Sequence, residues 1–209
     1  MSSCDVEETA MTATTLPDTR ERLLQATAGL LWEKSFQATS VDDLCSRAEA
    51  KKGSFYHFFA SKTDIAIAAI ENTWEQTRLA VFEPIFSSDA SGLTQIRNLV
   101  DTVHDYQTYL AQEKEAYLGC PFGNLGQEMA RQDERIRVVL HKIFLAHCNY
   151  LQGALERAVQ AKEIPAGNAV QRAQRLFALL EGAFLLAKVA NDPAVFKQAL
   201  ANVEIIAAS

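Results

Sequence analysis

Hydrophobic residues recur at spacings of three and four along almost the whole chain. The first such run, residues 18–34, places its apolar side chains on one helical face: Leu23, Leu24, Ala28, Leu30 and Leu31. No stretch keeps the alternation of period two that is typical of strands, and no segment repeats another. The pattern therefore predicts an all-α protein.

Capping and helix-breaking residues divide the rest of the pattern into further helices. Ser40 followed by Asp43 resembles a capping box, and Ser61 can cap a long helix that runs to about Phe86. Clusters of Ser, Gly, Asn, Asp or Pro predict turns at 87–89, 119–121, 164–167 and 191–193. The helices expected after the first are 40–48, 51–59, 61–86, 91–114, 122–131, 133–162, 168–190 and 193–207.

These segments fall into three regions. Residues 1–16 are polar, rich in Thr and Ser and without hydrophobic periodicity, which predicts a disordered tail. Residues 17–64 hold three short helices and form the first predicted domain, with Pro17 fitting the start of a helix. Residues 65–209 hold the longer helices and form a second, larger domain.

The composition argues against several classes of protein. No apolar run reaches the roughly 18 residues that a membrane span needs, and the acidic N-terminus does not resemble a secretory signal. The four cysteines are scattered, without a Cys-x-x-Cys pair: Cys4, Cys45, Cys120 and Cys148. We expect reduced thiols in a cytoplasmic protein, and we expect no metal, cofactor or membrane as a partner.

The net charge of −6 argues against nucleic acid only until its distribution is considered. Residues 17–64 carry seven Lys or Arg and seven Asp or Glu, so the excess of acid lies outside this region. Within it, Lys51, Lys52 and Lys62 cluster around one short helix. Phosphate contact requires a local basic patch and does not require a basic chain.

Residues 40–59 read as two short helices joined by a tight turn at Glu49-Ala50, the arrangement of a helix-turn-helix. In that motif the first helix crosses the DNA backbone and the second enters the major groove. The second helix fits this role: it combines lysines for phosphates, a glycine for close approach, and polar and aromatic tips. The candidate residues are Lys51, Lys52, Gly53, Ser54, Tyr56 and His57, with Phe55, Phe58 and Phe59 expected on the inward face.

The stretch from Leu23 to Asp64 resembles the DNA-binding domain of the TetR family of transcriptional regulators. The matching strings are TSVDDL at 39–44, KGSFYHFF at 52–59 and SK at 61–62. The resemblance implies a homodimeric repressor that binds double-stranded operator DNA through an N-terminal three-helix domain, followed by a larger helical domain for ligand binding and dimerisation. It implies DNA contacts by Thr39, Ser40, Lys52, Gly53, Ser54, Tyr56, His57 and Lys62.

Two positions depart from the family pattern. The family usually has Gly before the aromatic residue, where this chain has Ser35-Phe36, and Gly in the turn between the helices, where this chain has Glu49. A left-handed conformation at Glu49 would cost roughly 1 kcal/mol. Both departures concern the geometry of the loops that flank the helix at 40–48.

The resemblance also implies a small-molecule inducer that binds within residues 65–209. Aromatic groups with a few polar ones are usual in such sites. The candidate pocket residues are Trp74, Arg78, Phe82, Tyr106, Tyr109, Tyr117, Phe122, Phe144, His147 and Phe184. For each of them, ordinary core packing is the alternative interpretation.

Cys120 lies in a turn directly before a predicted helix, where the helix dipole can lower the pKa of a thiol. This pattern resembles TetR-family members that sense reactive electrophiles through a cysteine, and the same resemblance would place Lys188 nearby. The alternative is that Cys120 is a small buried hydrophobic residue in a tight turn.

Two apolar stripes near the C-terminus are interpreted as the seam of a homodimer. They are Leu176, Leu180, Ala183 and Ala187 in one helix, and Phe196, Ala199, Leu200, Val203 and Ile206 in the next. Small residues there, Gly182 among them, permit close approach of helices. The alternative is that both stripes close the core of a single chain.

Other classes of protein have less support in the sequence. It contains no G-x-S-x-G, H-E-x-x-H or phosphate-loop pattern, and His141 and His147 lie six apart, on different helix faces. We therefore do not expect an enzyme. A helical adaptor that binds no DNA is the third possibility.

Overall fold

The computed structural model describes residues 18–208, all of whose regular elements are helices. The predicted tail 1–16, with Cys4, and Pro17 lie outside the described residues. The first helices are α1 (Thr19–Glu33), α2 (Val41–Arg47), α3 (Lys52–Phe58) and α4 (Lys62–Thr77). They are followed by η1 (Arg78–Phe82), α5 (Glu83–Phe86), α6 (Gly92–Lys114) and α7 (Pro121–Met129). The last are α8 (Glu134–Gln160), α9 (Ala169–Ala190), α10 (Pro193–Ala199) and α11 (Val203–Ala208).

Local capping determines where the first helices begin. The Asp18 side chain accepts a hydrogen bond from the backbone N–H of Glu21 at the start of α1. Ser40 and Asp43 form the predicted capping box of α2, each side chain accepting from the other's backbone N–H. Ser61 caps α4. Glu49 has φ of 50°, so the turn after α2 adopts the left-handed conformation that was considered for it.

Two predicted helices are interrupted. The helix expected over 61–86 widens into the π-helical turn η1 just before Pro84, where the Glu83 N–H bonds to the Arg78 carbonyl oxygen. Proline has no N–H to donate and its ring crowds the carbonyl of the preceding turn, so the regular ladder cannot pass through Pro84 unchanged. The helix expected over 193–207 breaks at Leu200 into α10 and α11.

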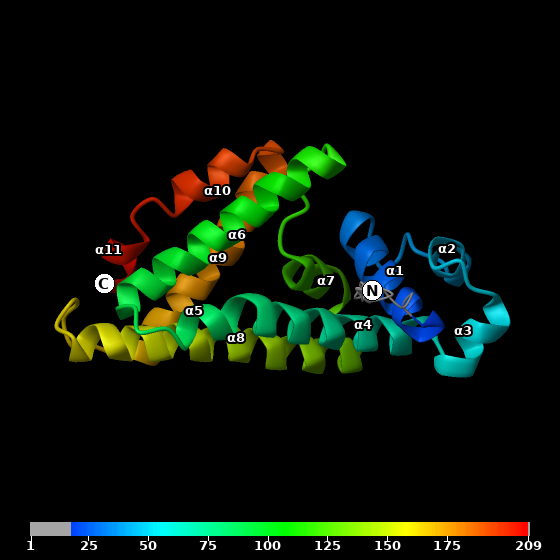
Figure 1. Ribbon diagram of the computed structural model, residues 1–209, viewed down its shortest axis with the longest axis horizontal. Coiled ribbons are helices and arrows are strands. Elements are labelled where there is room, and N and C mark those ends of the chain that lie inside the picture. Colours follow the sequence, from blue (N-terminus) through cyan, green and yellow to red (C-terminus); the bar gives the residue numbers. More distant parts are fainter. Residues whose placement is uncertain (1–17, 209) are drawn as a thin grey trace, which may run out of the picture.

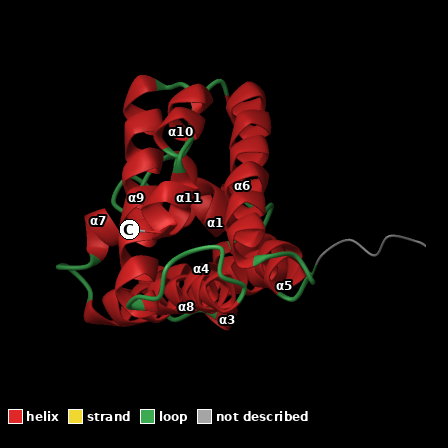
Figure 2. Cartoon of the chain, turned by 90° about the vertical axis from the view of Figure 1, so that its left-hand side faces the viewer, coloured by secondary structure: helices red, strands yellow, loops and turns green. Residues whose placement is uncertain are grey.

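The helices form two bodies joined along one long rod (Figure 1). The rod is the continuous run of α4, η1 and α5, with α8 alongside it, and α1 to α3 pack at one end. At the other end, α6, α9, α10 and α11 stand over the rod, as the turned view shows (Figure 2). The segment that contains α7 lies between the two bodies and contacts both α1 and α8.

The small body at the end of the rod has a core of its own. Leu23, Leu44, Phe55 and Ile65, from α1 to α4, are each at most 1 % exposed and belong to one hydrophobic cluster. Burial of such side chains contributes about 1.5–3 kcal/mol each. The three-helix unit predicted from residues 17–64 is therefore extended by the first turns of α4, which complete its core.

Candidate DNA-binding interface and ligand cavity

Helix α3 has one face in the core and one in solvent. Phe55 is fully buried, whereas the neighbouring Tyr56 is 59 % exposed. Lys51, Lys52, Gly53 and His57 are exposed too, and Ser54 is half-buried. Five of the predicted DNA contacts thus share an open surface on one short helix and its N-cap residue.

Gly53 is not required by the packing of the free protein. A Cβ at this position would meet no atom within 4 Å. The open space in front of Gly53 is available to a DNA backbone or base edge. Lys52 beside it forms an ion pair with Asp42 of 2.7 Å, but both side chains are more than half exposed, and such pairs are weak and readily exchanged.

Phe58 departs from the prediction. It was expected on the inward face with Phe55 and Phe59, but it is 40 % exposed, while the other two are buried. The short helix directs the Phe58 side chain away from the core. Phe58 lies on the solvent side next to His57, with ring centres 4.8 Å apart.

Three predicted DNA contacts have structural roles before DNA is present. The hydroxyl of Thr39 donates to the Ser35 carbonyl oxygen, and this residue is only 1 % exposed. Ser40 caps α2. Lys62 donates from Nζ to the carbonyl oxygens of Phe36 and Thr39, at 2.9 Å each. One N–H of the Lys62 ammonium remains for a phosphate, so we revise its assignment: it stabilises the loop before α2 as well.

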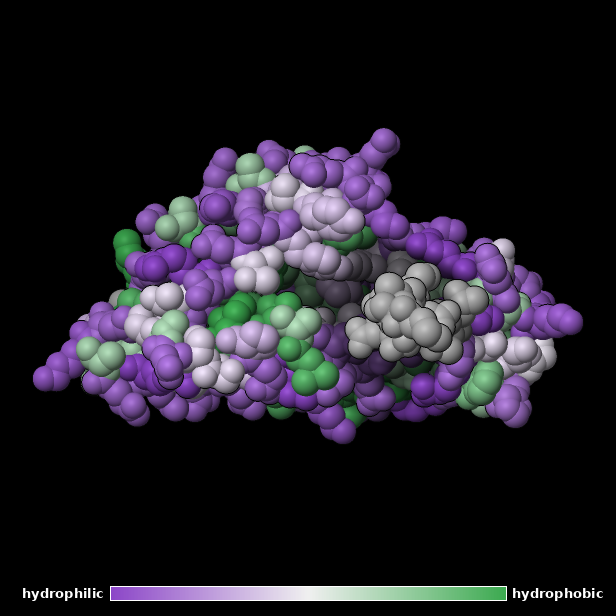
Figure 3. Space-filling view, viewed as in Figure 1, coloured by the Kyte–Doolittle hydropathy of each residue, from purple (hydrophilic) through white to green (hydrophobic). Residues whose placement is uncertain are grey.

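A cavity of about 160 Å³ lies in the larger body, lined by residues of α4, η1, α6, α7, α8 and α9 and closed on one side by Trp32 of α1. Five of the candidate pocket residues and the sensor candidate Cys120 line it: Phe82, Tyr106, Cys120, Phe122, His147 and Phe184. Figure 3 shows hydrophobic side chains gathered in the hollow between α6 and the rod. The structure thus brings together side chains from helices that are far apart in the sequence.

The remaining candidates lie elsewhere. Arg78 is on the surface of the rod in ion pairs with Glu75 and Glu83, and Tyr109 is 57 % exposed. Trp74 packs behind the cavity, its ring centre 4.5 Å from that of His147. Phe144 packs on Phe177, and Tyr117 is a buried residue whose hydroxyl has no partner in the described part of the chain.

Cys120 is the N-cap of α7, where its sulfur accepts a hydrogen bond from the Gly123 N–H at 3.3 Å. The prediction of a lowered thiol pKa is wrong. Burial, reinforced by the neighbouring Glu181 carboxylate, raises the pKa of Cys120 well above its usual value. The helix dipole acts on this thiol, but desolvation outweighs it because the side chain is enclosed.

Lys188 does not supply a compensating charge to this thiol. Its ammonium donates to Asn124 Oδ1 at 2.9 Å and lines a hollow on the outer surface with Trp32, Asn124 and Glu128. The Lys188 side chain does pass close to the turn, since a Cβ at Gly119 would lie 3.4 Å from its Cδ. The ionisable group that acts on the thiol is nevertheless an acid, Glu181.

His147 is enclosed by aromatic rings and is held neutral. Its Nδ1 lies 2.7 Å from the Ile143 carbonyl oxygen, which places the proton on Nδ1 and leaves Nε2 as an acceptor. Burial lowers the pKa of His147 to about 4. At neutral pH the imidazole is therefore an uncharged, aromatic part of the cavity wall.

Known proteins share this two-body architecture. Residues 23–69 match the family described as "Bacterial regulatory proteins, tetR family", and residues 92–203 match "Tetracyclin repressor-like, C-terminal domain", more than half of the chain. The chain belongs to the TetR family. Its members are DNA-binding transcriptional regulators, which agrees with the exposed face of α3.

Individual TetR-family relatives match over almost the full length. The HTH-type transcriptional repressor NemR of Escherichia coli K12 is 30 % identical over 195 residues, 92 % of this chain and 95 % of the relative. An uncharacterized HTH-type regulator from Lactococcus lactis is 29 % identical over 85 % of this chain and 87 % of its own length. The crystal structure of reduced E. coli NemR superposes with a TM-score of 0.75 at 28 % identity, covering 90 % of this chain and 97 % of that one.

The cavity lining also includes residues that the sequence analysis did not identify. Glu181, Gln107 and Trp32 line the cavity beside the predicted residues. Glu181 had a detectable signal, because it is a single acid within the apolar run of α9. Gln107 and Trp32 had none, since they lie on helices whose faces could not be matched to a common space before the fold was known.

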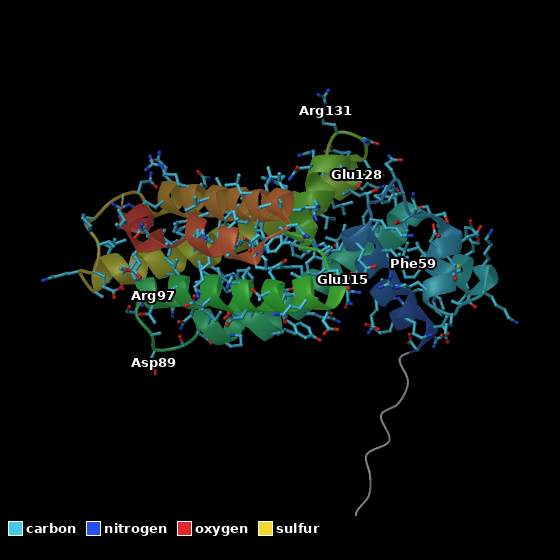
Figure 4. All side chains as sticks on the ribbon, turned by 90° about the horizontal axis from the view of Figure 1, so that it is seen from above. Phe59, Asp89, Arg97, Glu115, Glu128 and Arg131 are labelled. Atoms are coloured by element: carbon cyan, nitrogen blue, oxygen red, sulfur yellow. The ribbon has the colours of Figure 1, made fainter. Side chains whose placement is uncertain are left out.

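The same structure connects the cavity to the DNA-binding unit through α7. At its N-terminal end, Trp32 Nε1 of α1 donates to the Gly119 carbonyl oxygen at 2.8 Å. At its other end, the Glu128 carboxylate accepts from the backbone N–H groups of Phe36 and Gln37, both at 2.8 Å. Figure 4 shows Glu128 at the boundary where α7 meets α1. The loop before the helix-turn-helix is thus attached to a helix that begins at the cavity.

Proposed function

We propose that the chain is a homodimeric transcriptional repressor that α3 anchors in the major groove and that a ligand in the cavity releases from DNA. The observation that carries the first part is the two-faced helix α3. Phe55 fixes it in the core, while Lys52, Tyr56 and His57 project into open solvent. The relatives named as repressors support the direction of regulation. Such a protein acts in the cytoplasm, where the operator is.

The proposed homodimer uses a different stripe from the one that the sequence predicted. Leu176, Leu180, Ala183 and Ala187 are buried within the single chain, as are Phe196, Leu200 and Val203, so they close its core. The side chain of Ile206 lies outside the described part of the structure. These residues are therefore core residues of one chain and do not form the predicted dimer seam.

The outer face of α8 and α9 is the seam that we propose instead. Leu185 is 47 % exposed and Val189 is 80 % exposed, and they follow Gly182 on one face of α9 at spacings of three and four. On α8, Leu145 is exposed as well. A Cβ at Gly182 would meet nothing within 4 Å, which leaves room for a helix of a second copy to approach closely.

Release follows from the connection through α7. A ligand shifts a population only as far as it binds one conformation more tightly than the other. A ligand that displaces α7 would act on Phe36 and Gln37 through Glu128 and thereby change the position of the helix-turn-helix. Modification of Cys120, which lines the same cavity, is the second proposed trigger and would act on the same helix.

A mobility-shift titration tests the DNA-binding part. Wild-type protein, Tyr56→Ala and Glu71→Gln are titrated against DNA from upstream of the protein's own gene at two salt concentrations. We expect Tyr56→Ala to weaken DNA binding without changing the melting temperature. Glu71→Gln, which alters an exposed side chain of α4, should bind DNA like wild type. Equal affinity of Tyr56→Ala and wild type would refute the role of the exposed α3 face.

A further inference from the structure

The polar atoms that line the cavity are mostly hydrogen-bond acceptors. Gln107 is 3 % exposed; its amide nitrogen donates to the Gly119 carbonyl oxygen at 3.1 Å, while its Oε1 has no partner within residues 18–208. His147 offers Nε2, because Nδ1 is engaged by the Ile143 carbonyl. Buried polar groups without partners are rare in folded proteins and call for a physical explanation.

The donors around the cavity are already used. Trp32 Nε1 donates to the Gly119 carbonyl oxygen. The hydroxyls of Thr73 and Thr77 each donate at 2.8 Å to the carbonyl oxygen four residues earlier in α4. Two donors remain: Tyr106, which is 53 % exposed to solvent, and the protonated Cys120 thiol, a weak donor that lies beside Glu181. A ligand that brings hydrogen-bond acceptors would therefore find few donors inside.

Glu181 adds a carboxyl group to this set of acceptors, and burial raises its pKa because no cation offsets the loss of water. Its carboxylate lies so close over Gly123 that a Cβ there would collide with Oε2, so the glycine makes room for the acid. Lys and Arg are absent from the cavity lining, and no ion pair to Glu181 forms within the described chain. An enclosed carboxylate without a cation is costly, and a bound cation would remove that cost.

The remaining lining fits an aromatic group. Phe82, Phe122, Phe177 and Phe184 surround a volume of about 160 Å³. An apolar cavity of roughly 150 Å³ accepts a benzene ring, and aromatic faces attract cations. Size, shape and charge therefore agree on one class of ligand.

We propose that the cavity binds a small aromatic ammonium ion, whose N–H groups donate to Glu181, Gln107 and His147 and whose ring lies among the phenylalanines. Its role as the inducer rests on the function proposed above. Binding itself does not, because it can be measured without DNA.

Titration calorimetry with three probes of one shape tests the site: benzylammonium, benzyl alcohol and benzoate. A primary ammonium does not alkylate thiols, so Cys120 is a spectator. In wild-type protein we expect benzylammonium to bind at least about 10-fold more tightly than benzyl alcohol, and benzoate to bind most weakly, since hydrogen bonds to charged groups exceed neutral ones by this order. Absence of binding by millimolar benzylammonium, or tighter binding of either other probe, would overturn the proposal.

Variants separate charge from shape. Glu181→Gln keeps the size of the side chain and removes its charge, so it should weaken benzylammonium binding about 10- to 100-fold and leave benzyl alcohol almost unchanged. Glu71→Gln, the same exchange at an exposed site of α4, should have no effect. Gln107→Leu removes an acceptor, together with the hydrogen bond to the Gly119 carbonyl, but removes no charge, and it should cost less benzylammonium affinity than Glu181→Gln. Unchanged benzylammonium affinity in Glu181→Gln would contradict the assignment of that carboxylate.

Operator release is measured separately. If benzylammonium binds as expected but leaves the protein–DNA complex intact, the site is correct and its proposed role in regulation is wrong. If the protein binds no DNA at all, the calorimetric result still decides the ligand class.

Discussion

The DNA-binding unit (α1 to the first turns of α4) and the cavity domain (the rest of the described chain) differ in whether their buried polar groups have hydrogen-bond partners. In α1 to α3 and their loops, buried hydroxyls such as those of Thr27 and Thr39 donate to nearby carbonyl oxygens. The unpartnered buried polar atoms of the described chain all lie in the other domain, at His104, Gln107 and Tyr117. The first region is satisfied internally and can stay rigid, whereas the second retains bonding capacity that a ligand can use.

The largest expected effect comes from the rigid region. Phe55→Ala removes a fully buried ring from the core that holds α3. The substitution loses the transfer free energy of the buried ring and leaves a cavity, which adds a further cost. We therefore expect destabilisation by about 3–5 kcal/mol. Thermal unfolding measures it, and Tyr56→Ala, the exposed neighbour, is the control that should keep the wild-type melting temperature. A stable Phe55→Ala protein would show that the two faces of α3 are not divided as described.

Lys62→Ala tests whether this lysine is part of the rigid unit. It removes the two hydrogen bonds to Phe36 and Thr39, together with the contact of Nζ with the Phe36 ring at 4.2 Å. We expect a loss of about 1.5–3 kcal/mol in the free energy of unfolding. Lys51→Ala, on an exposed side chain of the α3 N-cap, should leave stability unchanged while both variants weaken operator binding. If the Lys62→Ala protein has wild-type stability, Lys62 does not stabilise the loop before α2, and its proposed role is limited to DNA contact.

Glu128→Gln tests the link between the two regions. One acceptor oxygen is lost, so one of the bonds to the N–H groups of Phe36 and Gln37 fails, at an expected cost of about 1–2 kcal/mol. Hydrogen exchange at these two amides should accelerate, while exchange in the core of α9 stays unchanged. Gln127→Ala, an exposed neighbour on α7, is the control. Equal exchange rates in Glu128→Gln and wild type would mean that α7 does not hold this loop.

The smallest expected effect is a pH dependence in the cavity domain. The pKa of His147 is lowered to about 4 by burial, so the unfolded chain, with its ordinary value of 6.5, binds a proton first as the pH falls. The stabilisation is complete above pH 6.5 and decreases toward pH 4, by about 1 kcal/mol between pH 7 and 5.5. His147→Leu should lose this part of the slope in urea titrations, and the exposed His141→Gln should retain it. An identical slope in His147→Leu would show that this histidine is not held neutral.

The same contrast explains what the sequence could predict. The helix starts at Ser40 and Ser61 depend on neighbours within a few residues, and the sequence predicted them correctly. The turn at Glu49 was located from the sequence, but its left-handed conformation was only considered there and is established by the structure. The direction of Phe58 was missed because a helix as short as α3 has too few positions to define its inward face.

Features that depend on tertiary packing could not be predicted from the sequence. Two stripes on α9 differ by only one or two positions, and periodicity alone could not show that Leu180 is buried in the chain while Gly182 is open. The cavity brings together Glu181 and Gln107, two residues 74 positions apart in the chain, which no local pattern records. The dipole argument for Cys120 was sound locally and failed because burial outweighs it.

The central claim is that two exposed α3 faces in one dimer read operator DNA, and a hydroxyl-radical footprint on the upstream DNA tests it most directly. We expect two protected half-sites related by two-fold symmetry, with centres about 34 Å apart or slightly more, the spacing of successive major grooves. Tyr56→Ala should lose both half-sites together at the same protein concentration. A single protected segment without symmetry, or no protection at all, would contradict the account.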